Sequence, residues 1–228
     1  MQLNPSRAYE KVWKKEKKKI VRSVTSRSIG EKRACWSDTT QQITRGWVSE
    51  MQPVTNQDLR DTHLTPRFAL LQNDKYRIID DYKLSEINCT ISSEDFYPPE
   101  NLDHLVHGVK DLTDLHYGQK RTKMFAMDIK DAFKCINIHP SSQDYAWLLG
   151  SYVQPFGSRR APTSWGRVVV MIQHIIRKLL GVRLLGYVDD LFCAEPEDTI
   201  DSGFLCTREL INLLGFTTPL KKTTPPCS

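Results

Sequence analysis

The sequence predicts an α+β protein in which a mainly antiparallel sheet is backed by helices on one side. Two segments, 68–79 and 183–194, each show the pattern of two strands joined by a short turn, which favours antiparallel pairing. Two others, 102–112 and 165–179, repeat apolar residues at the spacing of a helix with one buried face. Strands and helices alternate along the chain, but the hairpins favour an α+β arrangement over parallel βαβ units.

The first hairpin joins two apolar stretches, Phe68–Leu71 and Tyr76–Ile79, through four polar residues. Asn73 and Asp74 in its centre supply the usual turn chemistry. The next element is a helix that we expect to begin at Pro98-Pro99, because proline lacks only an N–H that a first helical turn leaves unpaired. Leucines and valines then follow at helical spacing up to residue 112.

Residues 124–128 (MFAMD) predict a short strand that ends in a carboxylate. A polar turn over 157–162 then opens a helix whose apolar face runs from Trp165 to Leu179. We expect this helix to end at Gly181, since glycine is the usual residue just past a helix C-terminus.

The second hairpin pairs residues 183–188 with residues 191–194 and carries Asp189-Asp190 at its tip. A last helix starts near Asp198 and stops at Gly215. The chain thus alternates from sheet to helix up to its final residues.

Length and charge narrow the class of protein. The 228 residues are enough to bury a core, and apolar runs of four or five residues are too short to span a bilayer. Residues 1–33 hold 11 Lys+Arg and 3 Asp+Glu, whereas residues 34–228 hold 21 and 24. We therefore expect a basic N-terminal arm over 1–33, which either contacts a polyanion or is a solvated, disordered charge run.

Cysteine usage and the first residues bear on the compartment. The six cysteines lack the two-residue spacing of zinc or redox motifs, so free thiols are the simplest interpretation. The N-terminus is polar and basic, without the apolar segment of a secretory signal. The sequence therefore predicts an intracellular protein with no membrane partner, and leaves cytoplasm and nucleus open.

The pair Asp189-Asp190 is the most informative feature of the chain. Two adjacent carboxylates between apolar strands repel each other and are costly to bury, unless the turn is exposed or a divalent cation is bound. If the strand ending at Asp128 lies beside this hairpin, Asp128 and Asp189 meet at one end of the sheet. Such oxygen donors suit Mg²⁺, and two ions can support an in-line displacement. An ordinary hairpin tip, and a helix N-cap at Asp128, are the alternatives.

Five stretches in chain order resemble motifs of the fingers and palm of a reverse transcriptase of the retrotransposon type. They are YRIIDDYK (76–83, with Leu84 and Asn88), FAMDIKDAF (125–133), PFGSRRAP (155–162), YVDD (187–190) and LLGF (213–216, with Lys221-Lys222). The resemblance implies a right-hand polymerase palm with a partial fingers subdomain and no thumb. It places a reverse transcriptase-like domain at 34–228, with fingers at about 34–120 and palm at about 121–228.

The resemblance also implies a catalytic metal site. Two Mg²⁺ ions, for which Mn²⁺ can substitute, would be bound by Asp128 and Asp189. Asp190 would be a nearby, less essential carboxylate, and the backbone carbonyl of Ile129 a further ligand. Tyr187 would support the end of the primer.

Further residues would bind the nucleotide. Arg77 would clamp the triphosphate, a task for which a guanidinium fork is well suited. Lys75 is a second candidate or a solvated turn lysine. Phe133 would exclude a 2′-hydroxyl from the sugar site, unless it is a core residue. Phe156 and Gly157 would pass close to the base and template.

The last of these candidates is Lys221, which would sit near the leaving phosphate or be a surface lysine. Together the motifs imply an enzyme, an RNA-directed DNA polymerase acting on deoxynucleoside triphosphates and an RNA or DNA template with primer. Oligomeric state stays open. An RNA-dependent RNA polymerase palm is one alternative, although Val188 and Phe133 argue against it. A truncated, noncatalytic nucleic-acid-binding remnant is the other.

Overall fold

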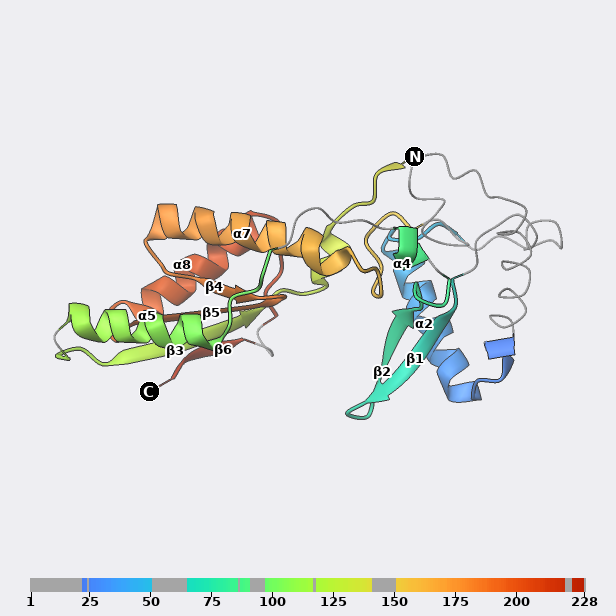
Figure 1. The fold of residues 1–228 in the computed structure, drawn as a ribbon, viewed down its shortest axis with the longest axis horizontal. Helices are drawn as coiled ribbons and strands as arrows, with labels where there is room; N and C mark the ends of the chain where they lie inside the picture. The colour runs from blue at the N-terminus through green and yellow to red at the C-terminus, as the bar shows by residue number, and fades with distance from the viewer. Residues whose placement is uncertain are drawn as a thin grey trace. The chain divides into compact units, whose positions relative to one another are not determined.

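The computed structural model describes residues 22–23, 25–50, 65–85, 87–90, 97–116, 118–140, 151–219 and 223–227 (Figure 1). The chain forms two compact units, each of which is described by itself. The first comprises residues 1–93 and 136–161, and the second comprises residues 94–135 and 162–228. Most of the predicted basic arm lies outside the described residues.

The first unit packs helix α2 (Ile29–Thr44) against a hairpin of strands β1 (Arg67–Gln72) and β2 (Lys75–Asp80), and adds the short helix α4 (Ile87–Thr90). Ser28 caps the start of α2: its side chain accepts a hydrogen bond from the Glu31 N–H, while the Glu31 carboxylate accepts one from the Ser28 N–H. The last residues of the predicted arm are therefore the first turn of a helix.

The β1–β2 hairpin confirms the predicted strand, turn and strand. Leu71 lies opposite Tyr76, Gln72 lies opposite Lys75, and Asn73 and Asp74 form the two-residue turn. Both turn residues have left-handed backbones, with φ of 49° and 58°. This is the conformation that Asn and Asp tolerate best among side-chain-bearing residues, and it matches the twist of a tight hairpin.

A buried ion pair joins the hairpin to α2. The guanidinium of Arg67, with a side chain 8% exposed, donates to the two carboxylate oxygens of Asp80 at 2.8 and 3.2 Å. It also donates to Thr39 and Gln42 of α2, at 2.9 and 3.4 Å. Because buried charges are tolerated when they are paired and fully hydrogen-bonded, this network fixes where β2 ends.

The second unit contains an antiparallel sheet with the strand order β4-β5-β3-β6. Its strands are β3 (Thr122–Asp128), β4 (Leu185–Tyr187), β5 (Asp190–Pro196) and β6 (Thr224–Cys227). The predicted strand at 124–128 and the second predicted hairpin are therefore both present. The hairpin turn is Val188-Asp189 rather than Asp189-Asp190, because Tyr187 pairs with Asp190.

Helices cover both faces of this sheet, which corrects the expectation of helices on one side. On one face, Leu185 and Ala194 pack with Leu105 of α5 (Leu102–Leu115). On the other, the ring of Phe125 contacts that of Phe204 in α8 (Ile200–Leu213), with centroids 5.5 Å apart. Strands β3 and β5 carry apolar residues on both faces, so both faces require cover.

The long helix α7 (Ala161–Leu180) lies on the same side of the sheet as α8. Trp165 and Ile172 on its apolar face are fully buried, but Leu179 is 69% exposed, so the buried face ends before the helix does. Gly181 follows the helix with a φ of 70°, as expected of a residue just past a helix C-terminus. Among the described helices, none combines the length and apolar character that a bilayer crossing requires.

Candidate active site

Three side chains form a row across the end of the sheet in the second unit. Asp190 is the direct partner of Tyr187 on β4 and of Asp128 on β3. Residues directly opposite each other in antiparallel strands carry their side chains on the same face. The prediction that the strand ending at Asp128 lies beside the hairpin is confirmed, although Asp190, not Asp189, is the residue directly across from Asp128.

The Val188-Asp189 turn is held from two sides. The Ile129 N–H, just past the end of β3, donates to the Asp189 carbonyl at 3.1 Å. The indole N–H of Trp165 in α7 donates to the Val188 carbonyl at 2.7 Å. Val188 has a φ of 56°, a left-handed conformation that is strained for a β-branched residue. The position of this turn is therefore determined by its surroundings and not by local propensity.

The carboxylates differ in exposure. Asp128 is 6% exposed, Asp189 is half-buried and Asp190 is exposed. Like charges directly opposite each other in a sheet repel, and a divalent cation bound between them would reduce that repulsion. Carboxylate oxygens are ligands that Mg²⁺ prefers, so these residues fit the ion that the sequence suggests.

Side chains alone do not complete a metal site in this part of the chain. Within the described residues, no group of three or more His, Cys, Asp and Glu side chains is arranged to hold a metal ion. Mg²⁺ commonly takes one or two carboxylates together with water and substrate phosphates. One or two of the carboxylates at this strand end could therefore serve as Mg²⁺ ligands together with water and substrate phosphates.

Phe133 lies in the 3₁₀ helix η1 (Ala132–Cys135), which follows β3 directly. Its side chain is partly buried, whereas its neighbour Ala132 is buried. The loop before it is fixed by the Lys130 N–H, which donates to the Thr217 carbonyl at 2.9 Å. Phe133 thus belongs to the same unit as the acidic row, five positions after Asp128.

Arg77 and Lys75 belong to the first unit, on strand β2. They are two positions apart in the same strand, so their side chains lie on one face of the hairpin, and both are exposed. Their partners across the hairpin are Leu70 and Gln72, which are uncharged. This face of the hairpin therefore presents two cations without a carboxylate directly opposite either one.

The loop at Phe156-Gly157 is also in the first unit, and it packs on the end of β2. The Asp80 N–H donates to the Phe156 carbonyl at 3.0 Å. A Cβ on Gly157 would lie 2.0 Å from the Asp80 carbonyl oxygen, and the φ of Gly157 is 116°. The glycine is thus required by contact with Asp80, whereas the sequence suggested an approach to base and template.

Asn88 in α4 secures the same loop. Its side-chain N–H donates to the Gly157 carbonyl at 3.1 Å, and its side-chain oxygen accepts the Arg159 N–H at 2.8 Å. The YRIIDDYK and PFGSRRAP stretches are therefore joined in the structure, although Asn88 and Gly157 are 69 positions apart. Phe156 is 45% exposed at the surface of this loop.

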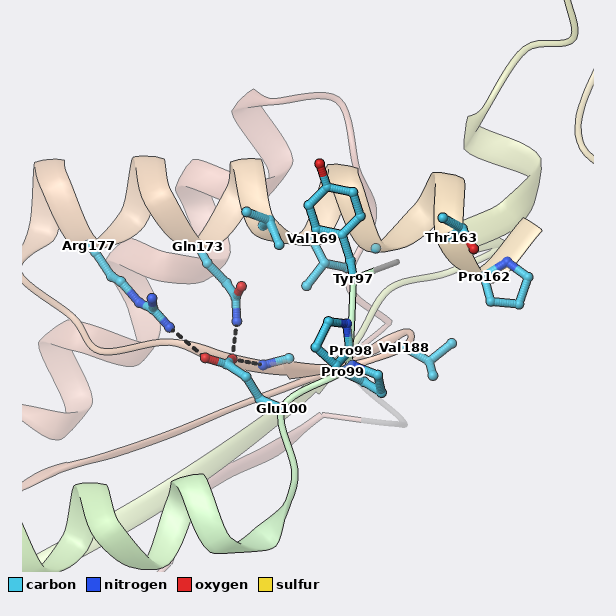
Figure 2. Close-up of a pocket in the computed structure, with 13 residues that line it drawn as sticks. Tyr97, Pro98, Pro99, Glu100, Pro162, Thr163, Val169, Gln173, Arg177 and Val188 are labelled. Atoms are coloured by element: carbon cyan, nitrogen blue, oxygen red, sulfur yellow. Dashed lines mark hydrogen bonds and ion pairs between the residues drawn. The ribbon is translucent and has the colours of Figure 1, made fainter. Parts of the chain in front are cut away.

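A polar cluster that the sequence analysis did not identify borders β4. Gln173 and Arg177 of α7 both contact the carboxylate of Glu100, which accepts the backbone N–H of Gly186 (Figure 2). The sequence feature that could have revealed this cluster is Gln173, a polar residue within the otherwise apolar buried face of α7.

Lys221, the remaining predicted site residue, lies outside the described residues. No protein-family model matches the chain.

Proposed function

We propose that this chain is the fingers and palm part of an RNA-directed DNA polymerase that adds deoxynucleotides to a primer 3′-hydroxyl. The observation that carries the proposal is the row of Tyr187, Asp190 and Asp128, with Asp189 beside it, at one end of an antiparallel sheet. This row contains two of the three acids predicted to form the catalytic site, Asp128 and Asp190. A backbone hydrogen bond from the Ile129 N–H to the Asp189 carbonyl ties the third to the same strand end.

The reaction would be a phosphoryl transfer. The primer 3′-oxygen forms a bond to the α-phosphorus, the bond to pyrophosphate breaks, and the hydroxyl proton passes to solvent. Bound Mg²⁺ ions would lower the pKa of the hydroxyl and neutralise charge on the leaving group. Asp128 and Asp189 would hold these ions, with Asp190 nearby and the Ile129 carbonyl as a further ligand. Tyr187, on the same face as Asp190, would support the primer end.

Residues of the first unit would bind the incoming nucleotide. Arg77 would contact the triphosphate through two parallel hydrogen bonds, and Lys75 on the same face would add a point charge. Phe156 would contact the base and template from its exposed position on the loop that Gly157 and Asn88 hold. Two residues of the second unit have further roles in the proposal: Phe133 would close the sugar site to a 2′-hydroxyl, and Lys221 would lie near the leaving pyrophosphate.

Primer extension tests this function directly. The full chain is incubated with oligo-dT on poly-rA, dTTP and Mg²⁺, beside Asp189→Asn and the matched control Asp198→Asn. Asp198 is an exposed acid of the same unit, paired with Lys120 and not placed in the site. We expect extension by the natural chain and by the control, and none by Asp189→Asn. Lack of extension by the natural chain, or equal extension by all three, would refute the proposal.

A further inference from the structure

Strand β4 is at the edge of the sheet, so its outward backbone groups have no neighbouring strand. Unpaired backbone groups at an edge need other partners when they are covered by protein. Four backbone groups of β4 and of the residues next to it have such partners: the carbonyls of Leu184, Gly186 and Val188 and the N–H of Gly186. Gly186 lies within the strand, Leu184 directly precedes it, and Val188 belongs to the turn that follows it.

A stripe of side chains on α7 supplies part of this cover. Trp165, Val169, Gln173 and Arg177 recur every four residues and therefore share one side of the helix. Trp165 donates to the Val188 carbonyl at 2.7 Å, and Arg177 donates through Nη2 to the Leu184 carbonyl at 2.7 Å. The stripe thus follows β4 from its start to the Val188-Asp189 turn.

Glu100 binds the remaining two backbone groups, the carbonyl and the N–H of Gly186. The backbone N–H of Glu100 donates to the Gly186 carbonyl at 3.1 Å, while its Oε2 accepts the Gly186 N–H at 2.9 Å. Gln173 donates to the same Oε2, and Arg177 donates to Oε1 at 3.1 Å. Figure 2 shows these side chains converging on the Glu100 carboxylate from α7.

Gly186 is also in close contact with the α7 helix itself. A Cβ at this position would lie 2.5 Å from Cγ1 of Val169, so α7 packs directly on its backbone. Gly186 immediately precedes Tyr187, Val188 and Asp189. Any shift of its backbone therefore moves the start of the YVDD segment.

We infer that Glu100 is a positioning residue for the candidate metal-binding turn: with Gln173 and Arg177, it fixes the backbone of Gly186 and thereby the placement of Tyr187 and Asp189. The inference rests on the proposed function. Its chemical basis is that three donors converge on Glu100, and a carboxylate can accept all of them. A glutamine at this position brings an NH₂ group of its own, which leaves at least one donor without an acceptor.

Removing the charge of Glu100 by the substitution Glu100→Gln need not unfold the unit. A cavity of about 390 Å³ borders Glu100, Gln173 and Arg177, and the Glu100 side chain is 25% exposed. Water can therefore reach a donor that Glu100→Gln leaves unpaired. The change is expected to loosen the turn more than it lowers the stability of the unit.

The test compares Glu100→Gln with Glu209→Gln, in which an exposed glutamate of the same unit, paired with Arg208, loses its charge. The hydrogen-exchange rate of the Gly186 amide reports how firmly β4 is fixed, and it can be measured without any enzymatic activity. We expect about 10-fold faster exchange in Glu100→Gln, the equivalent of one hydrogen bond. We also expect the Mg²⁺ concentration for half-maximal primer extension to rise by about 10-fold or more, as for residues that orient metal ligands.

A double variant provides the rescue. Glu100→Gln combined with Gln173→Glu exchanges amide and carboxylate, so that residue 100 can accept the Gly186 N–H and donate to residue 173, which can pair with Arg177. We expect it to recover most of the Mg²⁺ response. An unchanged Gly186 exchange rate, or a lower melting temperature with an unchanged Mg²⁺ response, would overturn the inference. Absence of extension by the natural chain would refute the proposed function instead.

Discussion

Asp128 and Asp190 lie directly opposite each other on adjacent antiparallel strands, β3 and β5. Asp128 is the last residue of β3 and Asp190 is the first residue of β5. The pair therefore lies at the end of the sheet, next to the hairpin turn and the 3₁₀ helix η1. Two carboxylates in this relation repel each other, and a bound divalent cation would reduce that repulsion. The pairing also brings Asp189 to the same edge, through its hydrogen bond with Ile129. The proposed metal site depends on this arrangement.

Phe133 is predicted to select the sugar. Replacing it with alanine should remove the ring that excludes a 2′-hydroxyl, and the preference for dTTP over UTP should fall by about 10-fold or more, as for other pockets altered by small groups. The measurement is the ratio of kcat/KM for the two nucleotides. Phe133→Tyr keeps the ring and serves as the control. If Phe133→Ala discriminates as well as the natural chain, Phe133 is not the gate.

Arg77 is predicted to bind the triphosphate. Arg77→Gln should raise KM for dTTP by about 10- to 100-fold, because a charge-assisted hydrogen bond contributes about 1.5–3 kcal/mol. Lys83→Gln removes one positive charge from an exposed position of the same unit and is the matched control. Steady-state primer extension at varied dTTP concentrations gives KM for each of the two variants. Equal KM values in both variants would show that net charge, and not Arg77, matters.

Gly157 is predicted to be essential for the first unit. Gly157→Ala places a Cβ 2.0 Å from the Asp80 carbonyl oxygen. Gly46→Ala also has a left-handed backbone, with φ of 67°, but nothing lies within 4 Å of its Cβ. We expect Gly46→Ala to cost about 1 kcal/mol or slightly more of unfolding free energy, and Gly157→Ala to cost several times as much. The unfolding free energies are measured by urea denaturation. Similar decreases in the two variants would contradict the close contact between Gly157 and Asp80.

The basic arm is predicted to contact nucleic acid. Ser28 and Glu31 form the cap of α2, so a deletion that respects the fold stops at residue 21. This deletion removes seven Lys and Arg residues. Binding of an RNA–DNA hybrid by the shortened chain should weaken and depend less steeply on salt, since fewer counterions are released. An unchanged salt slope in a fluorescence-anisotropy titration would show that the arm makes no phosphate contacts.

Local signals explain what the sequence could predict. The β1–β2 hairpin follows from Asn73-Asp74 between apolar stretches, and α7 and α8 follow from apolar residues at helical spacing. The approach of Asp128 to the hairpin could also be predicted, because both segments end apolar strands in a carboxylate. In each case, the determining residues are close together in the sequence or share one pattern.

Contacts between distant residues explain what the sequence could not predict. The turn falls at Val188-Asp189 because Ile129 and Trp165 hold it, despite the left-handed backbone of a valine. The start of α5 is set by Asn101, whose side chain caps the helix, so Pro98-Pro99 precedes it. Strand β6 contains two prolines, which are tolerated only because it is an edge strand.

The most direct test of the metal site is a Mn²⁺ titration followed by NMR, since paramagnetic broadening reports proximity without requiring turnover. At substoichiometric Mn²⁺, we expect the backbone amide signals of Ile129 and of residues 187–191 to broaden first. We also expect this selectivity to disappear in the double variant Asp128→Asn with Asp189→Asn. Broadening centred on another part of the chain, or retained in that variant, would contradict a metal site at the end of this sheet.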